Sequence, residues 1–172
     1  MKTRVVAFFL SLALLLGMLP ANVLAVETAS EPNKTSAAFC DSVIMDGRFT
    51  ESAWLRNARM SDGTKTQSFG VLWSSTDLYV AAIPNAGDSA MSITAAGKSL
   101  SVDLSTGALS GEIADRATAV VGAAVEVKIP LSSLGISIVS YGQEEDLKVS
   151  VGDLTWEGKV CFVSDDRSTI PT

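Results

Sequence analysis

Residues 69–82 read FGVLWSSTDLYVAA, and this stretch decides the fold. Large apolar side chains occupy alternate positions at 69, 71 and 73 and again at 78, 80 and 82, with the polar tetrapeptide SSTD between the two runs. A period of two places every second side chain on the same face of a strand. The stretch therefore predicts a β-hairpin with one face packed on a core.

The same period recurs along the chain. Residues 100–104, 125–129 and 147–151 alternate in the same way, and weaker candidates lie at 42–45, 90–94, 118–121 and 159–163. Turn-forming pairs such as Ala96-Gly97 separate these runs. Helix is scarce, because only Thr50 and Pro130 are suited to begin a single turn each. The chain is therefore predicted to be all-β, an antiparallel, jelly-roll-like β-sandwich of about 8–9 strands with one or two single-turn helices.

The N-terminus has the composition of an export signal. Lys2 and Arg4 precede an apolar run over residues 5–19, and Val23-Leu24-Ala25 suits a cleavage site. A membrane anchor is the alternative, but this run is shorter than the roughly 20 residues that span a bilayer as a helix. We expect residues 1–25 to be a cleaved signal peptide and the mature protein to be secreted or extracytoplasmic.

The remaining chain divides into a leader, one domain and a tail. Residues 26–38 are polar and lack a hydrophobic period, which predicts a flexible leader. We assign residues 39–165 to a single β-sandwich domain and residues 166–172 to a C-terminal tail.

The charge of the chain limits its partners. The formal net charge is −6, and loss of Lys2 and Arg4 leaves 11 cations against 19 acids, a formal charge of −8. Such a chain repels phosphate backbones and anionic lipids, so neither nucleic acid nor, after signal cleavage, a membrane is an expected partner. Neutral and cationic molecules remain possible ligands.

The two cysteines, Cys40 and Cys161, both belong to the mature part. In an oxidising compartment an even pair favours a disulfide between them. Two buried free thiols are the alternative, because the sequence does not fix the distance between their Cα atoms.

Three stretches, in this order along the chain, resemble carbohydrate-binding module family 9 and the wider group of DOMON-like sandwiches. They are IMDGRFTESAW (44–54), VLWSSTDLYVA (71–81) and VEVKIPLSSLGI (125–136). The resemblance implies a β-sandwich that binds a plant or cell-surface polysaccharide or oligosaccharide without catalysis. It also implies calcium, but Ser74 and Ile83-Pro84-Asn85 replace acidic positions of the family pattern, so we expect no cofactor.

The sequence lacks the residue combinations of common catalytic sites. The chain contains no His, which removes the commonest general base and the Ser-His and Cys-His nucleophile pairs. Four acids, Asp103, Glu112, Asp115 and Glu126, are conceivable as a glycosidase pair. Their positions on strands and turns favour ordinary solvated charges instead.

A sugar binder needs exposed aromatic rings beside polar groups. Trp156 stands among polar residues in DLTWEG (153–158), which favours an exposed turn with Glu157 as a polar neighbour. A place in the core is the alternative for Trp156. Tyr141, beside Gly142, is the second candidate ring. Trp54 and Trp73 are assigned to the core, Trp73 because it shares a strand face with Phe69.

Two other functions remain open at this level. The first is an extracytoplasmic accessory or protein-interaction module without a small ligand. The second is haem binding, which some DOMON-like sandwiches perform with Met plus His or Lys; the chain has Met45, Met60 and Met91 but no His.

Overall fold

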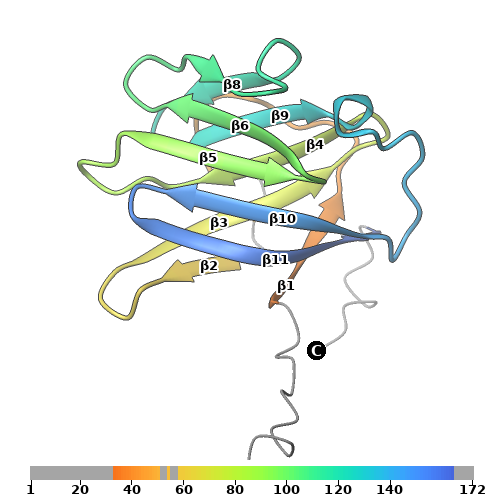
Figure 1. Cartoon of the computed structure of the whole chain (residues 1–172), viewed down its shortest axis with the longest axis horizontal. Helices are drawn as coiled ribbons and strands as arrows, with labels where there is room; N and C mark the ends of the chain where they lie inside the picture. Colours follow the sequence, from red (N-terminus) through yellow and green to blue (C-terminus); the bar gives the residue numbers. More distant parts are fainter. Residues whose placement is uncertain (1–32, 51–53, 55–57, 165–172) are drawn as a thin grey trace, which may run out of the picture. The chain divides into compact units, whose positions relative to one another are not determined.

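The computed structural model describes residues 33–50, 54 and 58–164 (Figure 1). The predicted signal peptide and C-terminal tail, 1–25 and 166–172, lie outside them. The elements, in chain order, are β1 (Asn33–Phe39), β2 (Ala58–Ser61), β3 (Thr66–Trp73), β4 (Asp77–Ala82), β5 (Ala90–Ala95), β6 (Lys98–Asp103), β7 (Leu109–Ser110), β8 (Thr118–Val121), β9 (Val125–Pro130), the 3₁₀ turn η3 (Leu131–Leu134), β10 (Glu144–Val151) and β11 (Leu154–Val163).

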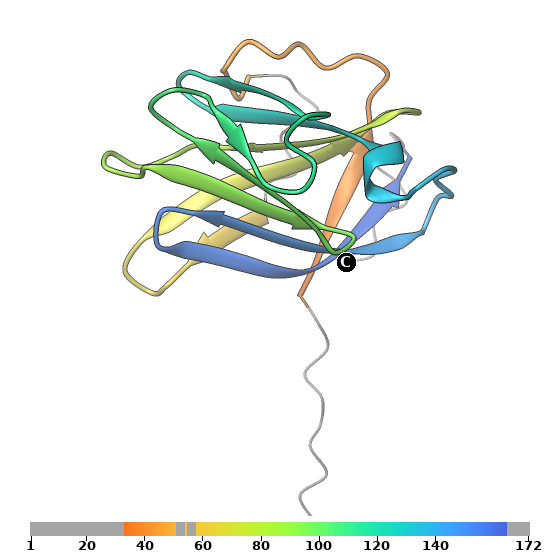
Figure 2. The same ribbon diagram turned by 45° about the horizontal axis from the view of Figure 1, so that its top comes forward.

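The strands form two layers joined through β1. The hydrogen-bonded order is β7-β6-β5-β10-β11-β1-β3-β4-β9-β8, and β2 pairs with β3 outside this path. Figures 1 and 2 show β5, β6, β10 and β11 as a front layer that lies over β3, β4 and β9. The predicted β-sandwich is confirmed, with eleven strands among the described residues instead of 8–9.

The space between the layers is filled by the alternating side chains that the sequence pattern identified. Phe69, Val71 and Trp73 of β3 point inward together with Leu78 and Val80 of β4, and all are buried. The front layer contributes Met91, Ile93, Leu100, Val102, Leu147, Val149, Val151, Leu154 and Trp156. At roughly 25 cal/mol per Å² of buried apolar surface, this cluster is the dominant stabilising term of the domain.

Strand β1 corrects the predicted leader. The polar composition of residues 33–38 predicts a flexible segment, yet these residues pair in parallel with β11, from Asn33↔Gly158 to Ala38↔Val163. The end of the strand also pairs in parallel with β3. Parallel partners come from distant parts of the chain, so no local turn signal announces them.

The segment of residues 40–50, here called the covering segment, corrects a second prediction. The sequence predicts a weak strand over residues 42–45, but they form no strand and instead contribute Val43 and Met45 to a small cluster on the outer face of β3 and β4. Trp54 is buried in this cluster, with its ring 5.5 Å from that of Phe49. Trp54 therefore lies against the outer face of β3 and β4, inside this cluster.

The two predicted helical turns have different outcomes. The turn after Pro130 is confirmed as η3, which Gly135 ends in a left-handed conformation, with φ +78°. The turn predicted between Thr50 and Trp54 involves residues 51–53, which lie outside the described residues. No helix in the described part of the chain is long and apolar enough to span a membrane.

The predicted disulfide is not formed. Cys161 pairs with Ser36 in the β1–β11 ladder, and Cys40 lies four residues beyond Ser36 along the chain. At about 3.3 Å per residue the two Cα atoms are roughly 13 Å apart, about twice the 4.4–6.8 Å of a bridged pair. Both cysteines are free and partly buried.

Candidate functional site

The outer face of β5, β10 and β11 carries a row of polar side chains. The register pairs Lys148 of β10 with Thr94 of β5 on one side and with Glu157 of β11 on the other. Partners in register lie on the same face, and their inward neighbours Ile93, Leu147 and Trp156 are buried, so these three side chains must point outward. The row thus results from the same alternation that builds the core.

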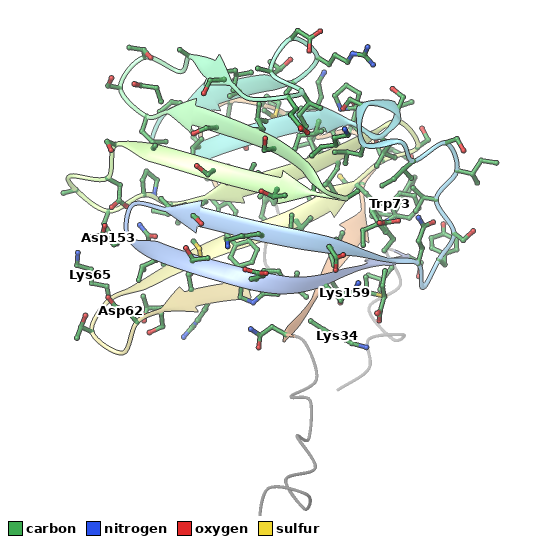
Figure 3. All side chains as sticks on the ribbon, in the orientation of Figure 1. Lys34, Asp62, Lys65, Trp73, Asp153 and Lys159 are labelled. Atoms are coloured by element: carbon green, nitrogen blue, oxygen red, sulfur yellow. The ribbon has the colours of Figure 1, made fainter. Side chains whose placement is uncertain are left out.

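Two solvent-exposed ion pairs lie on this face. Lys148 Nζ lies 2.9 Å from Glu157 Oε2, and Lys159 Nζ lies 2.6 Å from Asp146 Oδ1. The hydrogen bond from Lys159 to Asp146 raises the pKa of that ammonium above its ordinary value. Figure 3 shows Lys159 on the front layer, with Lys34 below it on β1. The charges of the pairs compensate each other locally, so this face carries little net charge and offers mainly hydrogen-bonding groups.

A groove of about 370 Å³ opens on this face. Its lining consists of Thr94, Gly97, Asp146, Leu147, Lys148, Glu157 and Gly158. Gly97 is in the turn between β5 and β6, at φ +75°, and no atom lies within 4 Å of the place where its Cβ would be. The backbone amide of Ala96 donates to the carbonyl of Asp146 at 3.0 Å, which fixes this turn against β10. The groove therefore has a rigid rim and an unobstructed edge.

The structure brings only one of the predicted site residues into the groove. Glu157 lines it, whereas Trp156 is in the core with 9% of its surface exposed and its ring 5.3 Å from that of Phe69. The prediction of an exposed turn at Trp156 is thereby corrected. The turn lies earlier, at Gly152-Asp153, and β11 begins at Leu154, so that 154 and 156 both point inward.

Tyr141 is the exposed aromatic ring of the described residues, with 66% of its surface accessible. Its ring meets that of Trp73 edge to face at 5.7 Å, and the indole nitrogen of Trp73 donates to the carbonyl of Val163 at 3.0 Å. Figure 3 places Trp73 at one end of the sandwich and the Asp153 turn at the other. Tyr141 is thus separate from the groove, at the end of the core.

The four acids considered as a glycosidase pair have structural partners. The pKa of Asp103 falls to about 2 because Ser105 and Thr106 donate hydrogen bonds to its carboxylate. Glu112 pairs with Lys98, and Asp115 with Arg116. Glu126 is fully buried and accepts hydrogen bonds from the backbone of the covering segment. These contacts give all four acids a structural role, but Glu126 is buried and is not the solvated charge that the sequence predicts.

The methionines of the haem alternative do not form a cofactor pocket. Met60 and Met91 are fully buried in the core between the layers, while Met45 packs against the outer cluster. Among the described residues no group of three or more His, Cys, Asp or Glu side chains is arranged to hold a metal ion.

Comparisons with known proteins identify the architecture. No protein-family model and no curated protein matches the sequence. Among solved structures, the chain is similar to a carbohydrate-binding module family 9 domain from Caldicellulosiruptor kristjanssonii in complex with glucose, with a TM-score of 0.59 and 14% identity over 81% of this chain and 100% of that one. A structure of such a module from the same organism in complex with cellotriose gives a TM-score of 0.58 and 14% identity, over 81% and 98% of the two chains. The chain has the fold of a family 9 carbohydrate-binding module.

Proposed function

We propose that this domain is a non-catalytic binding module that takes up a saccharide in the groove on the outer face of β5, β10 and β11. The observation that carries the proposal is the row formed by Thr94, Lys148 and Glu157, which places a hydroxyl, an ammonium and a carboxylate along one groove. The likeness to modules solved with glucose and cellotriose supports a saccharide as the ligand.

The chemistry of the groove suits sugar hydroxyls. Each hydroxyl donates one hydrogen bond and accepts others, so it can donate to Glu157 while a neighbouring hydroxyl accepts from Lys148. Hydrogen bonds to charged groups contribute about 1.5–3 kcal/mol net, more than bonds between neutral groups. The volume of about 370 Å³ lies within the 300–1,000 Å³ of typical small-ligand sites.

No aromatic ring lines this groove. The ligand is therefore held by polar contacts along its edge instead of by stacking of a sugar face on an indole. Polar contacts made at an open surface compete with water, so we expect modest affinity for a single short oligosaccharide.

The experiment is a glycan array followed by calorimetric titration with cellotriose. Glu157→Gln keeps the size of the side chain but removes its charge, and we expect about a tenfold loss of affinity, equivalent to about 1.4 kcal/mol. Glu144→Gln is the matched control, because it removes a similar ion pair, with Lys34 at 3.0 Å, from outside the groove lining. Equal binding by both variants, or no binding to any glycan, would contradict the proposal.

Export is part of the same proposal. The composition of residues 1–25 supports a secreted or extracytoplasmic module, where polysaccharides are found. N-terminal sequencing of the protein from the culture medium should begin at Val26. An accessory module that acts through protein contacts is the alternative function, and a blank glycan array would favour it.

A further inference from the structure

A second pocket lies at the edge of the sandwich, on the inner side of the β5–β6 hairpin. It has a volume of about 260 Å³ and is lined by Lys98, Glu112, Ile113, Asp115, Arg116 and Ser133. Lys98 pairs in register with Ala95, whose side chain is buried in the core between the layers, and partners in register share a face. Ser133 belongs to η3, which continues from β9 of the other layer. The pocket is therefore separate from the groove, with which it shares no lining residue.

The fold fixes the walls of this pocket. Ile113 is 5% exposed and packs into the core, so it provides an apolar floor. Ser133 Oγ donates to the carbonyl of Pro130 at 2.6 Å, which leaves the hydroxyl oxygen as an acceptor. Gly111, at φ +115°, lets the loop of residues 111–116 lie directly on β6, because a Cβ there would stand 2.7 Å from the carbonyl oxygen of Ser99.

The rim of the pocket carries two cations and two carboxylates in loose pairs. Lys98 Nζ is 3.7 Å from Glu112 Oε2, and Arg116 Nε is 3.9 Å from Asp115 Oδ2. Both distances exceed the 2.7–3.2 Å of a normal hydrogen bond. None of these four side chains has a hydrogen-bond partner among the described residues. Exposed ion pairs of this kind contribute little to stability, so a ligand can replace them readily.

The balance of charges on the rim selects the class of ligand. A simple anion is repelled by Glu112 and Asp115 and by the formal net charge of −6 of the chain, and a simple cation is repelled by Lys98 and Arg116. A molecule that carries both charges finds a partner for each. The planar fork of an Arg side chain matches a carboxylate, and a Glu carboxylate accepts from an ammonium group. The volume lies below the 300–1,000 Å³ of typical small-ligand sites, which limits the ligand to a small molecule.

We propose that this pocket binds a free α-amino acid with an apolar side chain. Its carboxylate binds Arg116, its ammonium group binds Glu112, and its side chain packs on Ile113. Both charged groups of an α-amino acid are attached to one carbon atom, which suits a rim where the cations and carboxylates stand 3.7 and 3.9 Å apart. This site goes beyond the proposed saccharide function and does not depend on it.

The test is a calorimetric titration of the mature protein with L-leucine and with two blocked forms of it. N-acetyl-leucine lacks the ammonium group, and leucinamide lacks the carboxylate. Leucine should bind with one molecule per domain, and each blocked form should bind at least about tenfold more weakly, because it leaves one charged group of the rim without its partner. Equal binding of leucine and either blocked form, or no binding of leucine, would overturn the amino-acid site.

Variants locate the site and separate it from the groove. Arg116→Gln and Glu112→Gln should each lower the affinity for leucine about tenfold. Arg59→Gln, at an exposed position of β2 outside the lining of both hollows, is the matched control and should keep the wild-type affinity. Thermal melts verify that the three variants are folded.

The outcomes distinguish this site from the saccharide groove. Wild-type affinity for leucine in Arg116→Gln would overturn the assignment, and so would competition between leucine and cellotriose for one site. Failure of leucine to bind leaves the proposed saccharide function standing, whereas a blank glycan array leaves the amino-acid site standing.

Discussion

Glu126 joins two parts of the chain that are 80 residues apart. Its Oε2 accepts hydrogen bonds from the backbone amides of Asp46 at 2.8 Å and Gly47 at 2.6 Å, and the side chain is fully buried. Asp46 and Gly47 belong to the first of the three stretches that resemble the family pattern, and Glu126 belongs to the third. The carboxylate gives a physical reason for the two motifs to occur together, because it satisfies the amides of a turn within the covering segment, which lies over β3 and β4.

Replacement of Glu126 by Ala should destabilise the domain strongly. It leaves two amide groups of the turn without their acceptor, and each hydrogen bond to a charged group is worth about 1.5–3 kcal/mol, so we expect a loss on the order of 3 kcal/mol. Glu126→Gln retains an acceptor oxygen and should lose less. Urea denaturation measures the difference, and equal stability of wild type and Glu126→Ala would contradict this assignment.

Trp156 and Tyr141 should respond in opposite ways to truncation. Trp156→Ala empties a large volume beside Phe69 and should cost about 3–5 kcal/mol of stability. Tyr141→Ala removes a ring that is 66% exposed and should lower the melting temperature only slightly. Thermal melts of the two variants provide the comparison. A small change for Trp156→Ala would place its indole outside the core.

The pairing of β1 with β11 requires a glycine, Gly158, in β11. Gly158 pairs with Asn33, and a Cβ at Gly158 would overlap the backbone carbonyl of Asn33. Gly158→Ala should therefore displace the start of β1 while the antiparallel pairing of β10 with β11 persists. Hydrogen exchange should become faster for the amides of residues 34–37 in particular. Unchanged protection of these amides would contradict the assignment of β1 to the sheet.

The strands that the sequence predicts are those with a strong period of two. β3, β4, β6, β9 and β10 each turn one face to the core between the layers, so large apolar residues alternate along them, although β3 and β4 also bury their outer face under the covering segment. The sequence pattern misses β1 because most of its residues are polar. It misses β2 and β7 because these strands have only four and two residues. Their positions depend on backbone pairing with distant partners, which leaves little trace in local composition.

The groove was only partly predictable for a related reason. Glu157 was identified beside Trp156, but a shift of one residue along a strand reverses the face, so a turn misplaced by a few residues exchanged the core and surface roles. No local sequence pattern marks Thr94, Asp146 or Lys148 as site residues. They become neighbours of Glu157 only through the registers of β5, β10 and β11.

The fold as a whole is held together without a covalent bridge. Cys40 and Cys161 lie too far apart along β1 and β11 to be joined, so unreduced protein should carry two thiols that an alkylating reagent modifies in denaturant. In the folded protein, burial raises the pKa of the Cys161 thiol, so its reaction should be slow at neutral pH and accelerate as the pH rises. A mass two hydrogens lower, with no alkylation, would show that the bridge forms.

The most direct measurement of the central claim is an amide chemical-shift map of the ¹⁵N-labelled mature domain titrated with cellohexaose. Binding in the groove predicts the largest shifts at residues 94–97, 146–148 and 157–158. The turn of β10 and β11 at Gly152-Asp153 should stay unchanged. Shifts centred on Tyr141 and its loop, with the groove silent, would contradict the account.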